Sequence, residues 1–543
     1  MSGGAESACF AALQQRLWDA PLGPWDALGV EEECTVVGLP STDFGPAFAE
    51  RNDVPALEAR WLYLLLLFAR PHARVAIVTS EPVSEDVVAY YRSLIPDAPP
   101  VGDRLGLFSV ADLGPRSLAE KLLDRPDVLA ALQAFVAGRP RAFVHPFSAL
   151  GAAERDVALR LDVPVLGIDA RFARYGAKSG GRRLLAAAGV PIPDGEEDVR
   201  DLAGAARAIA ALRSRRQVDE VVLKLDHGVT GGGNALIRLA GLPPAHAPAA
   251  RGALEGRLLD LDPAIRAGLA DGAVVEERVT GVAVVSPSVQ ARIVPGEPPE
   301  VVSTHDQILG GPLGHAYSGC RFPAAGAYAA ALEPYALAVA TRLADEGAAG
   351  RFALDFVVAL GTGGEWRPYA VEINPREGAT THPHGTLALL GGTRAPAGEA
   401  GGARAAGHGG ATHLRATDSL VVEGLRGTGW PAAVEALRAA GLAYDPQRGT
   451  GVILFMLEGI ARTGRVSLTA LGRGAEDAED LYERAVDVLR ATATPEPKTP
   501  AKGGTARHRP KHSEEARDEP TSFGDDLDVP PQPPAPRTLS VKQ

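Results

Sequence analysis

The stretch FALDFVVALGTGGEWRPYAVEINPR, residues 352–376, predicts a β-hairpin that carries acidic side chains. Strand-forming residues flank a glycine-rich turn, GTGGE, and a turn centred between Gly363 and Gly364 places Asp355 directly opposite Glu372. Because side chains alternate along a strand, Asn374 shares the face of Glu372, so the three polar groups converge. Two carboxylates that face each other are destabilising unless a cation lies between them, and Mg²⁺ prefers such oxygen ligands. The hairpin therefore predicts a Mg²⁺ site, with a solvated hairpin face as the alternative.

A second segment, VVLKLDHGVTGGGN at 221–234, joins a strand that carries Lys224 to a glycine-rich turn. The turn contains Gly231, Gly232 and Gly233, and glycines let successive backbone N–H groups turn inward and cradle phosphate oxygens. No Gly-Lys-Ser/Thr follows, so the segment is not a Walker loop. It predicts a phosphate-binding loop, and an ordinary glycine-rich hairpin is the alternative.

Lysine is rare in this arginine-rich chain, since only Lys121, Lys178 and Lys224 precede the C-terminal tail. The two cations are not interchangeable where a compact ammonium must fit beside a phosphate. Lys178 lies in GAKS (176–179) at a predicted helix start, where a positive charge opposes the helix dipole. A phosphate partner would explain it, and a surface lysine is the alternative. The segment VVEERVTG (274–281) is a strand leading to a bend, which offers backbone groups to an adenine edge or is an ordinary strand.

Residues 1–170 alternate short β-branched runs with helical segments, which predicts a parallel α/β sheet. No GxGxxG follows the first strand, so a dinucleotide fingerprint is missing. We expect strands at 35–39, 75–78, 142–144 and 163–168, and helices at 54–70 and 117–137.

Residues 171–415 predict a second domain, whose first helix (179–188) ends at Gly189, a natural left-handed stop. Residues 416–492 predict a smaller α+β unit, and the Pro-rich tail at 493–543 is predicted to be disordered. The second domain is expected to contain strands at 221–225, 274–279, 352–358 and 368–373 and a low-complexity loop at 391–410. The smaller unit is expected to contain strands at 452–455 and 466–471 and a helix at 475–491.

Composition narrows the class of function. The 543 residues are 45% hydrophobic and 22% charged, as in a globular protein, with a formal net charge of −12. That charge argues against nucleic acid or an anionic membrane as a partner. The N-terminus lacks a secretory pattern, and the most apolar run (61–69) is shorter than the roughly 20 residues of a membrane helix. Cys9, Cys34 and Cys320 form no metal-type pair, so we expect a reducing cytoplasm.

The order of these elements, from Lys178 and Lys224 to Asp355 and EINPR, resembles the ATP-grasp superfamily. More narrowly, the chain from about 35 to 490 resembles peptide ligases of the pheganomycin-biosynthesis type. The resemblance implies an α/β fold with a Rossmann-like pre-ATP-grasp domain, two α+β lobes that clamp ATP, and a small α+β C-terminal domain. The segments that carry the narrower resemblance are SPSVQARI (286–293), STHDQILGG (303–311), SGCRFP (318–323), EINPREGATTHPHG (372–385) and RGTGVILFML (448–457).

The resemblance also implies roles for individual residues. Where many relatives carry a ribose-binding acid, this chain has Ala283, and Arg351 stands four residues before Asp355. The ATP site would comprise Lys178 and Lys224 on the α- and β-phosphates, Gly231, Gly232 and Gly233 in the closing loop, and Glu276, Glu277 and Val279 along the adenine. The ion, Mg²⁺ with Mn²⁺ as an alternative, would be held by Asp355, Glu372 and Asn374. Arg376 would face the γ-phosphate and acyl-phosphate, with Arg321 and Arg292 as further catalytic candidates, and His305, Asp306, Gln307 and His382 would contact substrate.

The function implied is an ATP-dependent carboxylate–amine ligase that forms a peptide or amide bond through an acyl-phosphate. Its partners would be a small-molecule acid and an amine or peptide, with homodimer formation as an option. Two alternatives remain, an ATP-grasp kinase that leaves phosphate on its acceptor and a non-catalytic ATP-binding protein. For His382 the alternative is a structural role in capping a loop turn.

Overall fold

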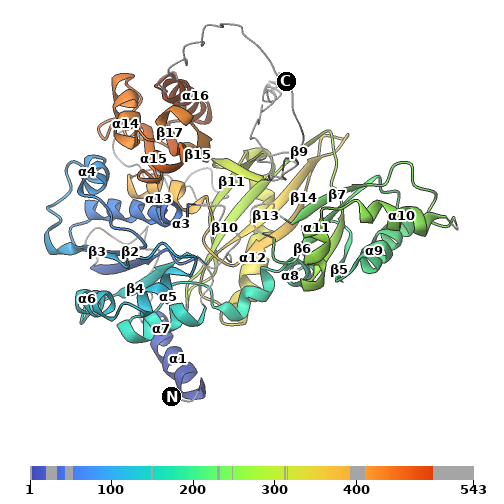
Figure 1. Ribbon diagram of the computed structural model, residues 1–543, viewed down its shortest axis with the longest axis horizontal. Helices are drawn as coiled ribbons and strands as arrows, with labels where there is room; N and C mark the ends of the chain where they lie inside the picture. Colours follow the sequence, from blue (N-terminus) through green and yellow to red (C-terminus); the bar gives the residue numbers. More distant parts are fainter. Residues whose placement is uncertain are drawn as a thin grey trace, which may run out of the picture. The chain divides into compact units, whose positions relative to one another are not determined.

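The computed structural model describes residues 3–19, 33–42, 53–147, 151–228, 233–247, 249–310, 314, 316–391 and 410–492. They belong to one compact unit and contain three β-sheets with helices packed on them (Figure 1). Most of the predicted low-complexity loop and all of the predicted disordered tail lie outside these residues. None of the described helices is long and apolar enough to cross a membrane.

The first sheet is parallel, as predicted, with strand order β3-β2-β1-β4. The predicted strand at 163–168 is wrong, because only an isolated bridge between Val144 and Val165 forms there. Pro164, the second residue of that segment, has no N–H to donate to a ladder. One strand, β3, was not predicted. The strands are β1 Cys34–Leu39, β2 Ala73–Thr79, β3 Leu105–Ser109 and β4 Ala142–Pro146.

Helices connect and cover this sheet, and two predicted helices prove to be split. The predicted helix at 54–70 is a short α-helix followed by a 3₁₀ helix, and the one at 117–137 breaks before Pro126. Arg125 is not helical there, as expected of a residue that precedes proline. The helices are α1 Gly3–Asp19, α3 Val54–Glu58, η1 Ala59–Ala69, α4 Glu85–Ser93, η2 Gly102–Arg104, α5 Leu118–Leu123, α6 Pro126–Val136, α7 Ala152–Leu161 and η3 Ala170–Tyr175.

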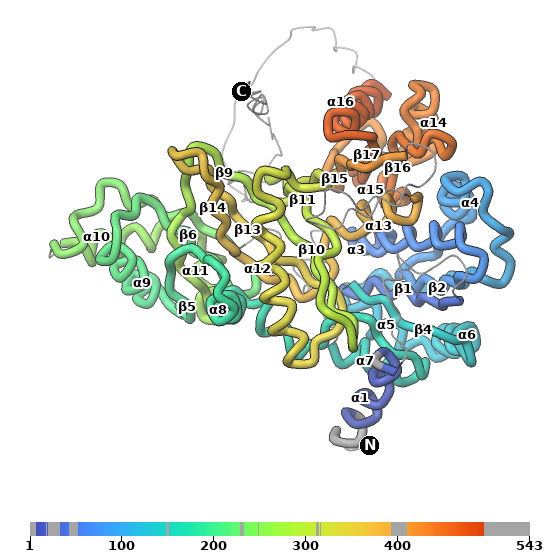
Figure 2. The backbone as a smooth tube through the Cα atoms, turned by 180° about the vertical axis from the view of Figure 1, so that it is seen from behind, coloured from blue at the N-terminus to red at the C-terminus, as the bar shows by residue number. Residues whose placement is uncertain are grey.

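A small antiparallel sheet of order β5-β8-β6-β7 follows, with helices α9 and α10 beside it (Figure 2). Helix α8, which starts at Lys178, is followed by Gly189 in the left-handed conformation (φ 71°), as predicted. The predicted strand at 274–279 ends two residues early. The elements are α8 Lys178–Ala187, β5 Gly195–Val199, α9 Leu202–Arg215, β6 Glu220–Leu225, β7 Asn234–Arg238, α10 Ala250–Leu259, α11 Pro263–Gly268, η4 Leu269–Asp271 and β8 Ala273–Glu277.

The largest sheet has the order β14-β13-β10-β11-β12-β15-β17-β16, with β9 paired to β13. It runs without a break across the predicted domain boundary at 415/416, because β15 pairs with both β12 and β17. Its strands are β9 Ala283–Val285, β10 Pro287–Ile293, β11 Glu300–Gly310, β12 Ala316–Phe322, β13 Gly350–Leu360, β14 Trp366–Asn374, β15 His413–Val421, β16 Gly451–Phe455 and β17 Arg465–Gly472. The associated helices are α12 Gly326–Asp345, α13 Thr381–Leu389, η5 Glu423–Leu425, α14 Trp430–Ala439, α15 Gly459–Thr463 and α16 Ala475–Ala491.

Helix η1 and the last strands of the large sheet share one hydrophobic core. Buried side chains of η1, such as Leu65, belong to the same cluster as Phe455 of β16 and Leu468 of β17. The Tyr90 hydroxyl of α4 accepts a hydrogen bond from the Leu454 backbone N–H at 2.8 Å. This shared core holds η1 against the large sheet and so forms one wall of the cavity described next.

Candidate active site

A cavity of about 400 Å³ lies along the large sheet, and successive strands from β14 to β17 line it. Its opposite wall includes residues that follow the carboxyl ends of β1 and β4, where the strand order of the parallel sheet reverses. Ligands of open α/β sheets bind in such crevices. The strand residues are Glu372 and Asn374, Ala353 and Asp355, Ser288 and Gln290, Gln307 and Leu309, Ala316 and Tyr317, Asp418 and Ser419, and Arg465; the others are Pro40, Thr42, Leu57, Arg60, Phe147, Arg376, Gly378, Ala379 and Thr380.

The hairpin of β13 and β14 places two acids face to face, as predicted. Asp355 pairs with Glu372, whereas the next pair is Phe356 with Ala370, so Val371 is the extra residue of a β-bulge. The strand pairs nearest the turn, such as Phe356 with Ala370, are centred on Gly363, half a residue from the predicted centre. The extra residue of the bulge shifts the register beyond it, so that Asp355 pairs with Glu372 as predicted. Both acids therefore line the cavity.

Two amide side chains converge on the same carboxylate. Asn374 Nδ2 donates to Asp355 Oδ2 at 3.0 Å, and Gln307 Nε2 donates to Asp355 Oδ1 at 2.9 Å. Arg376 Nη2 donates to Asn374 Oδ1 at 2.9 Å. The structure thus brings Asp355, Glu372, Asn374, Arg376 and Gln307 into one cluster, and the roles assigned to them remain predictions.

The electrostatics of this cluster suit a divalent cation. Burial and then the charge of Glu372 raise the pKa of Asp355 above its usual range. A cation between the two carboxylates relieves both effects. Among the described residues no group of three or more His, Cys, Asp or Glu side chains is placed to hold a metal, so this set offers two carboxylates and one amide. That donor set fits Mg²⁺, which keeps positions for water and substrate phosphates.

Lys178 forms an ion pair with an acid of the hairpin. It is the first residue of α8, and its Nζ lies 2.8 Å from Glu372 Oε1. The start of α8 is held by Asp226, whose Oδ1 accepts from the Ser179 backbone N–H at 2.8 Å. The side chain of Lys178 is 7% exposed, which rules out the surface-lysine alternative.

Lys224 lies on β6 and is oriented by a buried acid. Its Nζ is 2.6 Å from Glu276 Oε2. The glycine-rich turn after it lies partly outside the described residues, which include Gly233 but not Gly231 and Gly232. Gly233 has φ 103°, and a Cβ there would lie 3.2 Å from Gly228 Cα, so a side chain would be strained.

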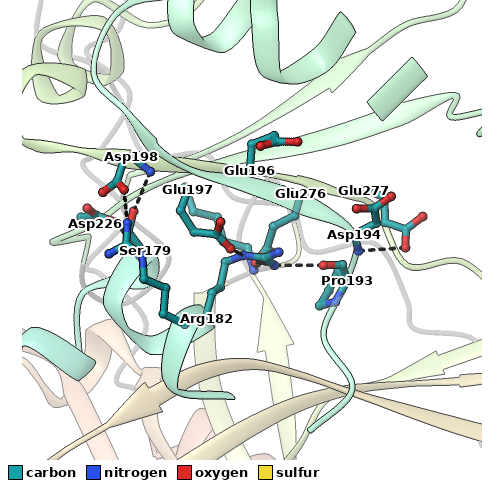
Figure 3. Close-up of polar contacts among 12 residues, drawn as sticks. Ser179, Arg182, Pro193, Asp194, Glu196, Glu197, Asp198, Asp226, Glu276 and Glu277 are labelled. Atoms are coloured by element: carbon teal, nitrogen blue, oxygen red, sulfur yellow. Dashed lines mark hydrogen bonds and ion pairs between the residues drawn. The ribbon is translucent and has the colours of Figure 1, made fainter. Parts of the chain in front are cut away.

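Glu276 and its neighbour Glu277 point to opposite sides of β8 (Figure 3). Glu276 is 2% exposed and accepts from Arg182 Nη1 at 2.8 Å. Burial alone would raise the pKa of Glu276, but the charges of Lys224 and Arg182 outweigh it and lower that pKa. Glu277 instead accepts from the Asp194 backbone N–H at 3.1 Å. Val279, predicted to lie beside the adenine, follows the end of β8 and is half-buried.

Several predicted site residues do not line the cavity. Burial lowers the pKa of His305 and of His382 well below the usual value, so both imidazoles are neutral. His305 Nε2 is 2.8 Å from Ser303 Oγ, and His382 packs on Phe455. Three further predicted site residues also contact other parts of the protein: the Tyr328 hydroxyl donates a hydrogen bond to Asp306 at 2.7 Å, Arg292 pairs with Glu300, and Arg321 pairs with Glu479 at 2.7 Å. All of these contacts are structural.

Three charged residues that the sequence did not single out do line the cavity, namely Arg60, Asp418 and Arg465. Arg60 and Asp418 form an ion pair across 358 positions of the chain. No local pattern marks them, because their proximity arises only when η1 packs on the large sheet.

Comparison with known proteins identifies a matching family model and a related enzyme. Residues 432–485 match the family model described as the PGM1 C-terminal domain. The chain is 32% identical over 438 residues to L-propargylglycine–L-glutamate ligase of Streptantibioticus cattleyicolor, with 77% of this chain and 86% of that protein covered.

Solved structures with a similar chain path include two enzymes. One is the biotin carboxylase domain of 2-oxoglutarate carboxylase from Hydrogenobacter thermophilus, with a TM-score of 0.47, 11% identity, and 83% of this chain and 89% of that chain covered. The other is N5-carboxyaminoimidazole ribonucleotide synthetase from Thermus thermophilus, with a TM-score of 0.45, 16% identity, and 84% and 98% covered.

Proposed function

The chain belongs to the family of ATP-grasp ligases that includes L-propargylglycine–L-glutamate ligase, and we propose that the cavity on its large sheet is where this chemistry takes place. It is an ATP-dependent ligase that joins a carboxylate to an amine. The observation that carries the assignment of the site is the meeting of Asp355, Glu372 and Asn374 with Lys178.

The reaction needs a leaving group, because a carboxylate is a poor electrophile. A carboxylate oxygen of the acid attacks the γ-phosphorus of ATP, and the bond from phosphorus to ADP breaks. The amine nitrogen then attacks the carbonyl carbon of the acyl-phosphate, the bond from carbon to the phosphate oxygen breaks, and the amine loses a proton. The products are an amide, ADP and orthophosphate.

Charged side chains of the cavity would serve the phosphoryl-transfer step. Asp355, Glu372 and Asn374 would hold Mg²⁺, which neutralises charge on the transferring phosphoryl group. Arg376 borders this set and faces the same cavity, so it would stabilise the acyl-phosphate. Burial lowers the pKa of Arg376, whose guanidinium nevertheless stays charged at any physiological pH.

The two buried lysines would hold the phosphate chain of ATP. Lys178 is paired with Glu372 and Lys224 with Glu276. A phosphate would offer both ammonium groups an additional anionic partner, and donors fixed in advance cost little reorganisation. The glycine-rich turn after β6 would then close over the phosphates. The side chain of Glu276 is already paired with Arg182 and Lys224. The adenine would therefore be contacted by backbone groups of β8 near Glu277 and not by the Glu276 carboxylate.

Amino acids are the proposed substrate class, because the relative is named for two amino acids, L-propargylglycine and L-glutamate. A role in peptide natural-product biosynthesis is proposed with it. The division into 1–170, 171–415 and 416–492, a homodimer and a cytoplasmic location also belong to the proposal. Light scattering of the purified chain tests the dimer.

An orthophosphate-release screen with paired acids and amines, followed by mass spectrometry of the products, tests the function. We expect release to require ATP, Mg²⁺, an acid and an amine together, with a product whose mass is the sum of both minus water. A stable phosphorylated acid without amide would instead support the kinase alternative. ATP binding without turnover of any pair would support the non-catalytic one.

A further inference from the structure

The cavity has a second charged end, away from the acidic hairpin. Arg60 of η1, Asp418 of β15 and Arg465 of β17 line it there. The strand order places β15 four positions from β13 in the same sheet. With neighbouring strands about 4.8 Å apart, this separates the two strands by at most roughly 19 Å along the sheet. A substrate that fills the cavity therefore meets charged side chains at both ends, those of the acidic hairpin at one end and Arg60, Asp418 and Arg465 at the other.

Arg60 retains hydrogen-bonding capacity at this end. The residue is only 9% exposed, and its Nη2 donates to Asp418 Oδ2. Its Nε is buried and has no hydrogen-bond partner among the described residues. Buried donors are nearly always satisfied, so an unpartnered guanidinium nitrogen beside a cavity points to a ligand.

Arg465 adds a second positive charge. It is the first residue of β17 and half-buried, and no carboxylate of the described residues forms an ion pair with it. Since Asp418 neutralises only one of the two arginines, the cluster carries a net charge of +1. One carboxylate completes it, and arginine binds carboxylates in a planar, two-bond geometry.

The floor between the two charged ends is mostly apolar. Leu309, Ala316 and Tyr317 line it from β11 and β12, and Phe147, which directly follows β4, lines the same cavity. Such a lining fits methylene groups better than further charges. The cavity thus has the polarity of an aliphatic dicarboxylate, charged at both ends and apolar between.

We propose that Arg60 and Arg465 bind a second, unreacting carboxylate of the acid donor, so that the enzyme selects dicarboxylates such as acidic amino acids. This inference rests on the proposed function for the identity of the reacting end. The reacting carboxylate of the donor must lie near the Mg²⁺ that Asp355 and Glu372 are proposed to hold. The remaining atoms of the donor then extend along the same cavity toward Arg60 and Arg465. Asp418 positions Arg60 through their ion pair.

The test compares donors that differ in one carboxylate. Orthophosphate release is measured with glutamate and glutarate against 4-aminobutyrate and butyrate, with ATP, Mg²⁺ and the amine held constant. We expect the dicarboxylates to be used at least tenfold more efficiently. Arg465→Gln should raise KM for the dicarboxylate about tenfold or more, leave KM for ATP and for the amine unchanged, and remove the preference over the monocarboxylates. Arg60→Lys should act in the same direction.

Arg438→Gln is the matched control, because Arg438 is an exposed arginine of α14 that pairs with Glu435 away from the cavity. An equal preference for mono- and dicarboxylates in the parent protein would overturn the proposal, as would a rise in the KM of the amine instead of the donor.

Direct binding separates this proposal from the proposed function. Calorimetric titration of glutarate and butyrate into the protein without ATP needs no turnover. Tighter binding of glutarate that Arg465→Gln abolishes and Arg438→Gln preserves would support the carboxylate subsite even if no ligation were found. Because Arg60 is buried, each variant is first compared with the parent by thermal unfolding, and Arg465→Gln, at a half-buried strand end, carries the test if Arg60→Lys does not fold.

Discussion

Asp355 and Glu372 face each other across β13 and β14 at a β-bulge, and Lys178 from the start of α8 lies 2.8 Å from the second of them. Both carboxylates are half-buried, and burial together with the charge of Glu372 raises the pKa of Asp355 even though Arg376 and Lys178 oppose the shift. The arrangement costs folding free energy unless a cation is bound, and sites of this kind are kept for function rather than stability.

Asp355→Asn should reduce Mg²⁺-dependent orthophosphate release by about 10²-fold or more, because charge stabilisation in the phosphoryl-transfer step is lost. Its free energy of unfolding should stay within about 1 kcal/mol of the parent, since a carboxylate repelled by Glu372 is removed. Activity assays over a Mg²⁺ titration and denaturant unfolding measure the two effects. Glu365→Gln, in the exposed turn of the same hairpin, is the control and should change neither.

Lys178→Gln should raise KM for ATP by roughly tenfold to a hundredfold, the equivalent of one charge-assisted hydrogen bond. Steady-state kinetics with varied ATP measures it. Arg183→Gln removes a charge from the same helix, where Arg183 is exposed and pairs with Asp198, and should leave KM for ATP unchanged. An equal effect of both variants would show that α8 acts through its overall charge and not through Lys178.

Glu276→Gln should lower the free energy of unfolding by about 3–5 kcal/mol, because Arg182 and Lys224 would lose their buried counter-charge. Chemical denaturation measures the loss. Glu220→Gln on the same small sheet breaks pairs with the more exposed Arg238 and Arg278 and should cost less than about 1 kcal/mol. Similar losses in the two variants would contradict the buried network of Glu276 with Lys224 and Arg182, of which Figure 3 shows Glu276 and Arg182.

The stability of the protein should fall as pH rises through neutrality, owing to Glu58. Burial raises the pKa of Glu58 from 4.5 to about 7, although hydrogen bonds from Ser80 and the charge of Lys121 oppose the shift. The folded state therefore holds this proton more tightly, so its contribution is full below about pH 4.5 and is lost as pH rises through about 7. The loss amounts to roughly 3 kcal/mol.

Denaturant unfolding of the parent and of Glu58→Gln at pH 5 and pH 8 measures this contribution. The variant cannot ionise at this position, so its stability should change less between the two pH values. A parallel pH dependence in both proteins would assign the effect to other groups.

Gly180→Ala should destabilise the protein by about 1–3 kcal/mol, because a Cβ there would lie 1.9 Å from the carbonyl oxygen of Arg174 and force α8 away from η3. The shift would also move Lys178 and weaken ATP binding. In contrast, Gly256 of α10 has open space around its Cβ position, and Gly256→Ala should stabilise by up to about 1 kcal/mol through helix propensity. Thermal unfolding of both variants makes the comparison.

Much of the acidic hairpin could be predicted from the chain alone. The alternation of side chains and the glycine-rich turn are local, so the pairing of Asp355 with Glu372 followed from positions 17 residues apart. The α8 start at Lys178 and its stop near Gly189 were likewise local signals. The failures were local too: the segment around Pro164 is predicted as a strand from its apolar residues, but Pro164 has no N–H with which to extend the ladder beyond one bridge.

The partners of these side chains could not be predicted. Gln307 reaches Asp355 from β11, and His305, two residues before it on the same strand, is instead fully buried beside Ser303. Both belong to one polar run in the sequence, and alternation gives them the same face. Which of the two residues lines the cavity depends on how neighbouring elements pack over β11: Gln307 lines it, and His305 is covered.

The sequence by itself determined most of the strands and helices and the face of the hairpin that carries the acids, and it singled out the two rare lysines predicted to hold phosphate, because these depend on short-range geometry and on residue chemistry. The tertiary structure alone decided that Lys178 meets Glu372 and that Arg60 meets Asp418, 194 and 358 positions away. Contacts of that length arise when sheets and helices bury their apolar faces together, and no local pattern specifies which long side chains then come within reach of each other.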